Sequence, residues 1–432
     1  MTTRDFQKSE ALLKRTLKTI PLGSQTFSKS HTQYARGVSP FFISRGEGAR
    51  VWDVDGNEYI DFVSALAAIT LGYNDPAVTA AVQAQLAEGT LFSLPHPIEM
   101  EVAEAIVEMV PCAEMVRFGK NGSDATAGAV RLARAHTSRD HVIACGYHGW
   151  QDWYIGATTR NKGVPDAVRA LTHTVAYDDL DAMRDTFRRY PGGVAAVILE
   201  PMNVAEPSPG YLEALKEMVH ENGALLIFDE MVTGFRLANG GAQAYFGVTP
   251  DLATLGKGMA NGYPLSTVVG PERLMREMEE IFFSFTMGGE TLSLAAALAT
   301  LTKLRKEPVT ATLAERGGRI LSGVQELIEG HGMGEVLSVS GHPTWPFLNL
   351  HGHGDCDYWD IQTLYQQEMF ARGVLCLGAH NLTYAHTAED IETLLAVYDE
   401  VFAVLRAAVY DGEMKERLHC EPLQPLFRAR GD

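Results

Sequence analysis

Two residues of this chain, Lys257 and Asp229, have the types and the placement needed to hold a carbonyl compound and to withdraw electrons from it. Lys257 lies in the run Gly256-Lys257-Gly258, and Asp229 follows an apolar run that ends at Phe228. A lysine amine can form a Schiff base with an aldehyde, and a buried carboxylate can keep a pyridine nitrogen protonated. The pair therefore indicates the chemistry of pyridoxal phosphate, whose aromatic ring draws electrons from a reacting carbon.

The surrounding sequence predicts where these two residues lie in the fold. The run 223–228 is short and continuously apolar, which predicts a buried parallel strand with Asp229 at its carboxyl end. Open α/β sheets bind ligands beyond those strand ends. Position alone leaves two alternatives open, because Asp229 could cap a following helix and Lys257 could be a solvated loop residue. The glycines around Lys257 favour a ligand site, since they let backbone approach a ligand closely.

Further motifs occur in a fixed order along nearly the whole chain. They cover residues 51–62, 71–73, 121–125, 146–149, 199–201, 226–235, 254–262 and 385–387. In this order and spacing the motifs resemble the class III pyridoxal phosphate aminotransferases, and among these the glutamate-1-semialdehyde aminomutase branch. The resemblance implies an α/β protein of fold type I, with a mostly parallel seven-stranded sheet in a large domain and a smaller α+β domain. It also implies an enzyme whose cofactor is pyridoxal 5'-phosphate.

Composition is that of a globular enzyme with a large core. The chain has 432 residues, of which 46% are hydrophobic and 21% charged. The net charge of −18 argues against nucleic acid or an anionic membrane surface as a partner. The five cysteines are scattered and form no Cys-x-x-Cys pair, so we expect neither a disulfide framework nor a zinc knuckle, and a reducing cytoplasmic location. No apolar stretch approaches the roughly 20 residues of a membrane span.

Sequence periodicity predicts three segments. Residues 1–75 combine a helix to about Thr19, strands at 41–44 and 49–54, and a hairpin turn at 55–57, and they are expected to join the small domain. Residues 76–310 alternate strands with helices and form the predicted large domain. Residues 311–432, which end in a long helix at 388–410, form the rest of the small domain.

The cofactor's phosphate needs backbone donors, and the start of a predicted helix at 119–124 can supply them. We expect Gly122 and Ser123 to do so from the helix N-terminus. A nucleotide P-loop is the alternative, but the order Gly-x-x-x-x-Gly-Lys-Ser/Thr is absent. Relatives usually carry Ser-Gly-Thr/Ser here, often followed by Glu-Ala, so Asn121 and Asp124 depart from the pattern and backbone contacts are the firmer expectation.

Other cofactor contacts follow from the resemblance. Tyr147 would stack on the pyridine ring and His148 belongs to the same Tyr-His-Gly motif, whereas packing alone is the alternative for an isolated tyrosine. Glu200, at the end of the strand 194–199, matches a family position near the ring, and Asn203 lies close to it. We expect Glu200 to support the site and not to enter the reaction.

The resemblance also predicts a homodimer with active sites at the interface. Thr286 falls in the segment where relatives carry a threonine that reaches the phosphate of the neighbouring subunit. The family's Gly-Asn-Pro after this threonine is Gly289-Glu290-Thr291 here, so the local backbone is expected to differ. The alternative is a threonine in a glycine-rich turn.

Substrate residues are predicted from the loop near the N-terminus and from an aromatic loop. Relatives of the aminomutase branch place an arginine on the substrate carboxylate where this chain has Lys29, and a lysine does not replace the planar fork of a guanidinium. Ser28 and Lys29 are expected to contact an aldehyde or ketone acceptor, and a polyhydroxylated, sugar-derived compound is favoured. Exposure at the surface is the alternative for Lys29. Trp150, with Trp153 and Tyr154, is expected to form a wall of the pocket.

The rival site is a loop with five potential metal ligands in seven residues, His351-Gly352-His353-Gly354-Asp355-Cys356-Asp357. Relatives have a variable surface loop here, so no metal is expected. The sequence thus predicts an aminotransferase that moves an amino group from a small amine or amino-acid donor to a small carbonyl acceptor. An intramolecular 2,1-aminomutase or a racemase would use the same lysine, and a non-catalytic relative would lack Lys257 or Asp229.

Overall fold

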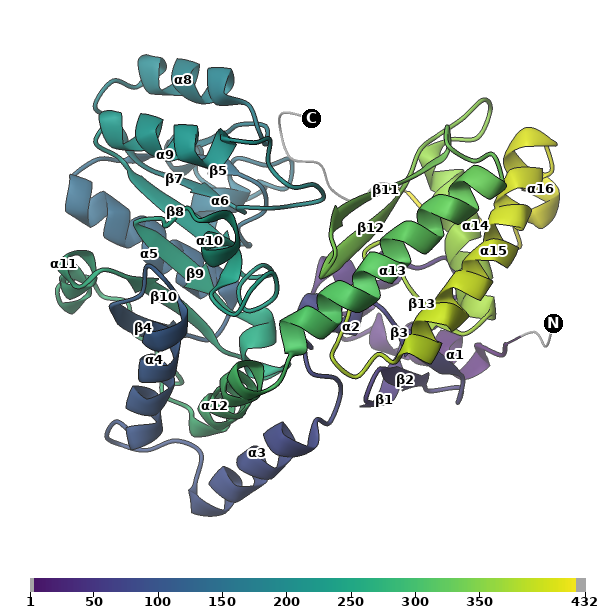
Figure 1. Cartoon of the computed structure of the whole chain (residues 1–432), viewed down its shortest axis with the longest axis horizontal. Coiled ribbons are helices and arrows are strands. Elements are labelled where there is room, and N and C mark those ends of the chain that lie inside the picture. The colour runs from purple at the N-terminus through teal and green to yellow at the C-terminus, as the bar shows by residue number, and fades with distance from the viewer. Residues whose placement is uncertain (1–3, 425–432) are drawn as a thin grey trace. The chain divides into compact units, whose positions relative to one another are not determined.

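The computed structural model describes residues 4–424, which form two compact units (Figure 1). One unit contains residues 4–66, the segment Leu71–Asp75 and residues 311–424. The other contains Ala67–Thr70 and Pro76–Thr310 and carries most of the predicted site residues. Within residues 4–424, no helix is long and apolar enough to cross a membrane.

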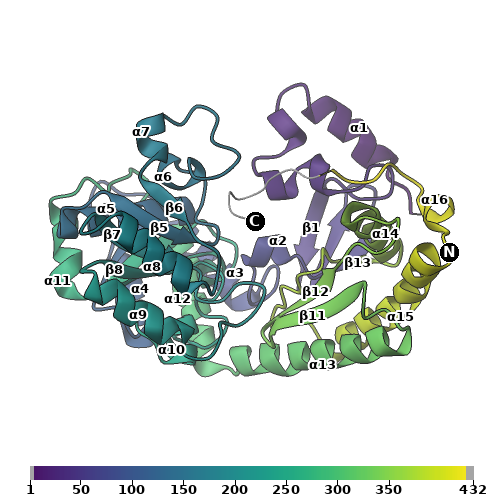
Figure 2. The same cartoon turned by 90° about the horizontal axis from the view of Figure 1, so that it is seen from above.

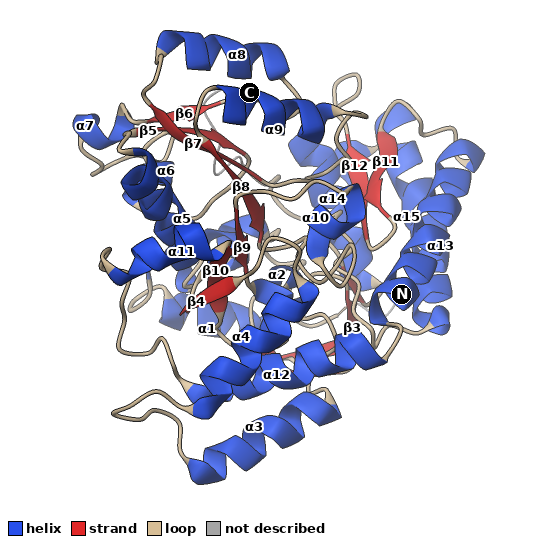
Figure 3. Ribbon diagram, turned by 60° about the vertical axis from the view of Figure 1, so that its left-hand side comes forward, coloured by secondary structure: helices blue, strands red, loops and turns tan. Residues whose placement is uncertain are grey.

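The second unit is built on a seven-stranded sheet with the order β4-β10-β9-β8-β7-β5-β6. Only β10 is antiparallel to its neighbours, which confirms the predicted mostly parallel sheet. Figure 3 shows the strands as a twisted row with helices on both sides. The strands are β4 (Met115–Gly119), β5 (His141–Cys145), β6 (Thr172–Thr174), β7 (Val194–Leu199), β8 (Leu225–Glu230), β9 (Leu252–Leu255) and β10 (Ser266–Gly270).

The inner strands are covered on both faces, which explains why their sequences are apolar without alternation. Every residue of β7, β8, β9 and β10 is buried. Val130 and Leu132 of α5 pack in one core with Ile198 of β7 and Ile227 of β8. The helices of this unit are α3 (Pro76–Glu88), α4 (Pro97–Met109), α5 (Gly122–Thr137), α6 (Asp152–Ile155), α7 (Asp166–Arg169), α8 (Leu180–Arg189), α9 (Tyr211–Glu221), α10 (Gly241–Phe246), α11 (Glu272–Met275) and α12 (Thr291–Lys306).

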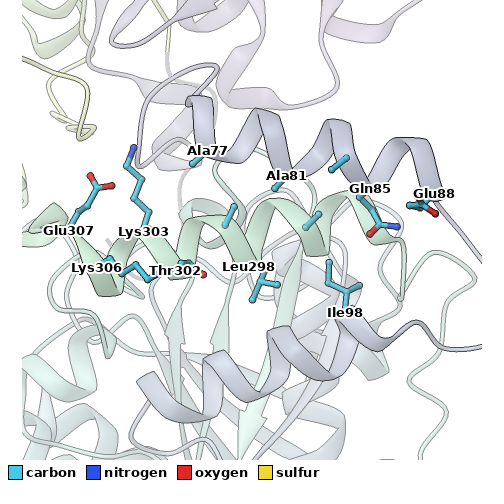
Figure 4. Close-up of a pocket in the computed structure, with 13 residues that line it drawn as sticks. Ala77, Ala81, Gln85, Glu88, Ile98, Leu298, Thr302, Lys303, Lys306 and Glu307 are labelled. Carbon is cyan, nitrogen blue, oxygen red and sulfur yellow. The ribbon is translucent and has the colours of Figure 1, made fainter.

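A groove of about 640 Å³ lies between α3, α4 and α12 of this unit (Figure 4). Small side chains such as Ala77 and Ala81 of α3 leave the space, and Ile98 and Leu298 close it from α4 and α12. None of the predicted site residues lines this groove.

The first unit combines two small sheets with long helices. A four-stranded sheet has the order β1-β2-β3-β13, and β11 and β12 form a hairpin. Figure 2 shows the long helices α13 and α15, which are joined by an ion pair of 2.8 Å between Arg319 and Glu392. The elements are α1 (Gln7–Thr16), β1 (Ile43–Glu47), β2 (Arg50–Asp53), β3 (Glu58–Asp61), α2 (Ser64–Ala67), α13 (Val309–Gly330), β11 (Leu337–His342), β12 (Trp345–Leu350), α14 (Tyr358–Ala371), β13 (Val374–Leu375), α15 (Ala388–Tyr410) and α16 (Met414–Arg417).

The predicted hairpin at 55–57 is confirmed, whereas two boundaries near it are not. Asp53 Oδ1 accepts the amide hydrogens of Asp55 and Asn57 and so shapes the turn between β2 and β3. The strand predicted at 41–44 is wrong by two residues, because its ladder with β2 starts at Ile43 and runs to Glu47. The first helix ends at Thr16, before the predicted Thr19.

Candidate active site

Neighbouring strand ends bring the predicted site residues to one edge of the large sheet. Lys257 follows β9, and Asp229 is the penultimate residue of β8. Glu200 follows β7, and Tyr147 lies two residues after β5. These strands are adjacent and parallel, so their carboxyl ends meet at the same edge, where open α/β sheets bind ligands. Asp229 and Lys257, which were predicted from separate motifs, therefore lie at the same edge of the sheet.

The Asp229 carboxylate is fixed by three partners. Its Oδ2 lies 2.8 Å from Nδ1 of His148, and its Oδ1 accepts hydrogens from the Met231 amide at 3.2 Å and the Thr254 hydroxyl at 3.3 Å. Thr254 is its register partner on β9, so the sheet itself sets this contact. Asp229 is 3% exposed, and it does not cap a helix.

His148 contacts Asp229 through one ring nitrogen and a backbone carbonyl through the other. Its Nε2 lies 3.1 Å from the carbonyl oxygen of Cys145, and a carbonyl can only accept, so Nε2 carries a hydrogen. Its Nδ1 faces the Asp229 carboxylate, and an ionised Asp229 then requires a hydrogen on Nδ1 as well. Both ring nitrogens are therefore engaged, which fixes the orientation of the imidazole against Asp229. His148 was predicted to bind the cofactor, and the structure places its ring in contact with Asp229 and with the Cys145 carbonyl.

Lys257 is held in an unusual backbone conformation at the start of η4 (Lys257–Ala260). Its φ of 44° is in the left-handed region, which lysine rarely adopts. The residue is exposed to solvent, yet protein atoms surround its amine closely enough to desolvate it. These surroundings lower the pKa of the amine, and the positive charge of Arg236 lowers it further, while Glu200 and Asp229 act in the opposite direction. An amine with a lowered pKa can act as nucleophile and base near neutral pH.

Glu200 is a second carboxyl at this edge, and it is bonded to Asn203. The amide Nδ2 of Asn203 donates to Glu200 Oε2 at 2.6 Å. Burial raises the pKa of Glu200 from 4.5 to about 7, and the negative charge of Asp229 adds to this shift. Gly146 must be a glycine, because a Cβ there would lie 2.7 Å from Glu200 Oε2. The loop after β5 thus packs directly on Glu200.

The raised pKa of Glu200 predicts a pH dependence of stability. Between about pH 4.5 and 7 the folded protein keeps a proton that the unfolded chain has lost, so the free energy of unfolding falls as pH rises through this window. Glu200→Gln should remove this part of the fall, which amounts to about 3 kcal/mol at most. Chemical denaturation of the cofactor-free protein at pH 4.5 and 7.5 gives the free energy of unfolding at each pH. An equal fall between the two pH values in wild type and in Glu200→Gln would contradict the assignment.

The start of α5 has the features of a phosphate site. Gly122 and Ser123 are its first two residues, and the Asp124 carboxylate accepts the amide hydrogen of Asn121 at 2.7 Å. A Cβ on Gly122 would lie 3.0 Å from the sulfur of Met231, so the glycine lets the start of α5 pack closely against the loop that follows β8. Helix N-terminal amides bind phosphate well. Asp124 departs from the family pattern, and here its carboxylate stabilises the first turn of α5 through this bond to Asn121.

The loop after β5 is tied to that helix start. The Trp150 amide donates to Ser123 Oγ at 3.2 Å, and the Thr126 hydroxyl donates to the His148 carbonyl at 2.8 Å. Gly149 fits there because a Cβ would lie 2.2 Å from Ser123 Oγ. Ser123 therefore holds the aromatic loop in place with its side chain, in addition to its predicted backbone role.

The aromatic residues of this loop separate into two groups. Tyr147 and Trp150 are 56% and 67% exposed, so both rings are available to a ligand. Trp153 and Tyr154 instead belong to the hydrophobic core, and they were named as pocket walls from sequence. Their burial follows from α6, which turns them onto the sheet.

The Thr286 segment is exposed and is anchored close to the start of α5. Phe285, Thr286 and Met287 lie in the loop before α12. Glu290 accepts the amide hydrogens of Leu292 and Ser293 and so begins α12. It also pairs with Lys120 at 3.0 Å, one residue before Asn121. Where the family has Asn in Gly-Asn-Pro, this chain has Glu290, which both caps α12 and forms an ion pair with Lys120.

Three contacts of the site were not predicted from the sequence, although Thr254 and Asn261 lie within the motif 254–262. Thr254 binds Asp229 across two strands, Arg236 is completely buried near Lys257, and burial lowers the pKa of its guanidinium to about 10. Asn261 accepts a hydrogen bond from the backbone of Thr70. Each of these contacts joins residues that pairing or folding brings together, so local patterns do not reveal them.

The remaining predicted residues lie in the first unit. Ser28 and Lys29 are exposed in η2 (Phe27–Lys29), and Lys29 is near enough to Asp61 to lower the pKa of that buried carboxyl, against the larger opposite effect of burial. In residues 4–424 no group of three or more His, Cys, Asp or Glu side chains could hold a metal ion. In the rival loop, Asp357 instead accepts the amide hydrogens of Trp359 and Asp360 and caps α14.

Comparison with known proteins decides the family. The family model for class III aminotransferases matches residues 33–382. The chain belongs to the class III aminotransferase family. This aminotransferase is 36% identical to a glutamate-1-semialdehyde 2,1-aminomutase 2 of Exiguobacterium sp. (strain ATCC BAA-1283 / AT1b), over 86% of the chain and 91% of that protein. It is 33% identical to a 3-aminobutyryl-CoA aminotransferase of Cloacimonas acidaminovorans, over 92% of the chain and 97% of that protein.

Solved structures agree with the family. The FumI protein of Sphingopyxis sp. MTA144, solved in its PLP internal aldimine form, has a TM-score of 0.87 and 29% identity, and the match covers 96% of this chain and 99% of that chain. An omega-transaminase from Sphaerobacter thermophilus has a TM-score of 0.83 and 26% identity, and the match covers 92% and 98%. The enzyme is a pyridoxal phosphate-dependent aminotransferase of class III.

Proposed function

We propose that this aminotransferase moves an amino group from a small amine or amino-acid donor to an aldehyde or ketone through Lys257. The observation that carries the proposal is the convergence of a deprotonatable lysine and a fixed carboxylate at adjacent strand ends. Their chemistry matches that of the cofactor, whose aldehyde needs an amine and whose pyridine nitrogen needs a carboxylate. The N-terminus of α5 supplies the third requirement, a set of backbone donors for phosphate.

Each residue has a distinct task in the proposed reaction. When bound, pyridoxal phosphate supplies an aldehyde that condenses with amines and a ring that withdraws electrons from the adjacent carbon. Asp229, oriented by its contact with Nδ1 of His148, would hold the proton on the ring nitrogen. Gly122 and Ser123 bind the phosphate, and Tyr147 covers the ring. The amine of Lys257 would bind the cofactor's aldehyde, and as a free base it would move a proton at the substrate carbon.

A second candidate is an intramolecular aminomutase or a racemase. The 36% identity to a protein named as an aminomutase favours it. Against it, Lys29 occupies the position at which the aminomutase branch carries an arginine. A flexible ammonium group replaces a planar two-point carboxylate clamp, so we propose a different acceptor, with a polyhydroxylated carbonyl compound as the first choice.

Spectra with single amines separate the two candidates. The cofactor-loaded enzyme is mixed with one amine at a time, such as glutamate, alanine or a simple primary amine. We expect one donor to convert the cofactor's absorbance to that of its aminated form, with one equivalent of the donor's carbonyl product per site. If no donor does so while a single amino compound is isomerised, the enzyme is a mutase or racemase.

We further propose a cytoplasmic homodimer whose sites are completed by Thr286 of the neighbouring subunit. Apolar side chains are exposed around this segment: Phe282 is 84% exposed, Met287 52% and Met100 of α4 58%. Phe285 and Met100 line one cavity of about 360 Å³, so α4 and the Thr286 loop form a single surface. Such an exposed apolar surface is typical of a protein interface.

Mixed dimers test whether Thr286 acts across the interface. Lys257→Ala and Thr286→Ala subunits, carrying different tags, are co-expressed and the mixed dimer is purified. If Thr286 acts in the partner's site, one site of the mixed dimer has both residues intact and keeps wild-type affinity for the cofactor. If it acts in its own subunit, neither site is intact, and we expect an affinity equal to that of the Thr286→Ala homodimer. A titration at limiting cofactor distinguishes these results.

A further inference from the structure

Residues Ala67–Thr70, here called the 67–70 strap, form a short segment that packs in a different unit from the residues before and after it. The strap belongs to the unit that carries Lys257, whereas the residues on both sides of it, Leu66 and Leu71, belong to the other unit. Ile69 and Thr70 are 7% and 3% exposed. A short segment is buried so well only where its backbone and side chains find specific partners.

The partners of the strap are the residues that follow Lys257. The Thr70 amide donates to Oδ1 of Asn261 at 3.0 Å, and this bond is buried. A Cβ on Gly258 would lie 2.1 Å from the Thr70 hydroxyl oxygen, and one on Gly262 would lie 2.5 Å from Cδ1 of Ile69. The strap thus lies in direct contact with the backbone on both sides of Asn261.

The turn that carries Lys257 begins and ends in the left-handed region. Lys257 has a φ of 44° and Asn261 a φ of 46°, with η4 between them. Such a conformation is unfavourable for a lysine, whose Cβ crowds the following carbonyl, and it persists only where surrounding contacts hold it. Within the turn itself, the amides of Met259 and Asn261 bond to Gly256 and Gly258. The Asn261 side chain adds the contact that fixes the turn to a distant segment.

We propose that Asn261 is a positioning residue that holds the Lys257 turn in its reactive conformation by binding the 67–70 strap. The inference rests on the proposed role of Lys257 as the residue that binds the cofactor's aldehyde. Asparagine also tolerates a left-handed backbone by itself, so a test must remove the side-chain acceptor and keep the conformation accessible. Asn261→Gly meets both conditions, because glycine adopts this region without strain.

Asn74 provides a matched control. It too is left-handed, with a φ of 53°, and its side chain makes a backbone hydrogen bond, donating to Gly46 O at 2.8 Å. Asn74→Gly therefore makes the same chemical change at a residue of the other unit, outside the contacts of the Lys257 turn. Asn261→Asp is the conservative variant, because a carboxylate oxygen can still accept the Thr70 amide.

The first readout is amide hydrogen exchange of the cofactor-free protein. In Asn261→Gly we expect the peptide containing Thr70 and the peptide containing Lys257 to exchange about tenfold faster, the effect of one lost buried hydrogen bond. Asn74→Gly should leave both peptides unchanged, and Asn261→Asp should stay within about twofold of wild type. Unchanged exchange in Asn261→Gly would overturn the proposed contact.

The second readout separates a positioning role from a purely structural one. Lys257 is allowed to condense with pyridoxal phosphate, which releases water, and sodium borohydride then adds hydride to the new carbon–nitrogen bond at timed intervals. Mass spectrometry of the Lys257 peptide gives the rate. We expect about tenfold slower labelling in Asn261→Gly, and a kcat lowered similarly with KM nearly unchanged. Faster exchange with wild-type labelling and kcat would show a structural contact only and would overturn the positioning role.

The same data keep this inference separate from the proposed function. If wild-type Lys257 is labelled but no donor is turned over, the proposed transfer reaction is wrong, and the labelling rate of Asn261→Gly still decides the positioning role. If wild-type Lys257 is not labelled, the proposed function and the positioning role both fail, whatever the exchange data show for the strap.

Discussion

Lys257→Ala should lower turnover by roughly 10⁴-fold or more, because under the proposed function it removes both the amine for the cofactor's aldehyde and the base for the substrate proton. The fold should survive, since the residue is exposed and its ammonium group donates no hydrogen bond on which the strands depend. Lys257→Arg should be nearly as inactive, because a guanidinium stays charged at neutral pH. Steady-state turnover with the donor found in the spectral assay, per mole of folded protein, measures the effect.

The control for this prediction is Lys306→Ala on α12. Lys306 is an exposed lysine that lines the groove between α3, α4 and α12, and it has no contact with the catalytic edge of the sheet. We expect unchanged turnover. Retained turnover in Lys257→Ala would instead show that another residue carries the chemistry.

Asp229→Asn should lower kcat on the order of 10³-fold, with a nearly unchanged fold. The amide has the shape of the carboxylate but not its charge, so it can no longer keep a ring nitrogen protonated. Its oxygen can still accept from His148 or from Met231, which preserves the local structure. Cofactor absorbance and kcat of the same preparation should show a loaded but slow enzyme.

Asp251→Asn is the matched control for Asp229. Asp251 lies just before β9, at the opposite end of the same pair of strands, and its Oδ2 accepts the Leu226 amide at 2.8 Å. This substitution should reduce stability and leave kcat of the folded enzyme within about twofold. An equal loss of kcat in both variants would mean that charge at Asp229 has no special role.

Long apolar runs and helix caps made much of the fold predictable. β7 and α15 begin and end where sequence patterns place them, because each is bounded by turn residues or a cap. Thr387, for example, accepts the Asp390 amide and starts α15. The predicted start at residue 41 failed because the partner strand, and not the local sequence, sets where β1 begins.

The candidate site was predictable where residues follow strands directly. Lys257, Asp229, Glu200 and Tyr147 all lie just beyond apolar runs, so their common edge follows from strand order alone. The contacts among them were not predictable. The bond of His148 to Asp229 and the contact of Asn261 with Thr70 each join residues far apart in sequence.

Local backbone geometry was equally hidden. Ser64, Ala65, Leu66 and Ala67 all have positive φ angles, although none is a glycine. No propensity predicts a left-handed turn of such residues, because the conformation is unfavourable for each of them. Tertiary contacts must impose it, as they impose the φ of 44° at Lys257.

Covalent trapping tests the central claim most directly. The protein is loaded with pyridoxal phosphate, reduced with borohydride, digested and examined by mass spectrometry, before and after incubation with the preferred donor. We expect the cofactor mass on the peptide containing Lys257, and its loss when the donor has aminated the cofactor. A cofactor mass on a different lysine, or none on a protein that still turns over, would contradict the account.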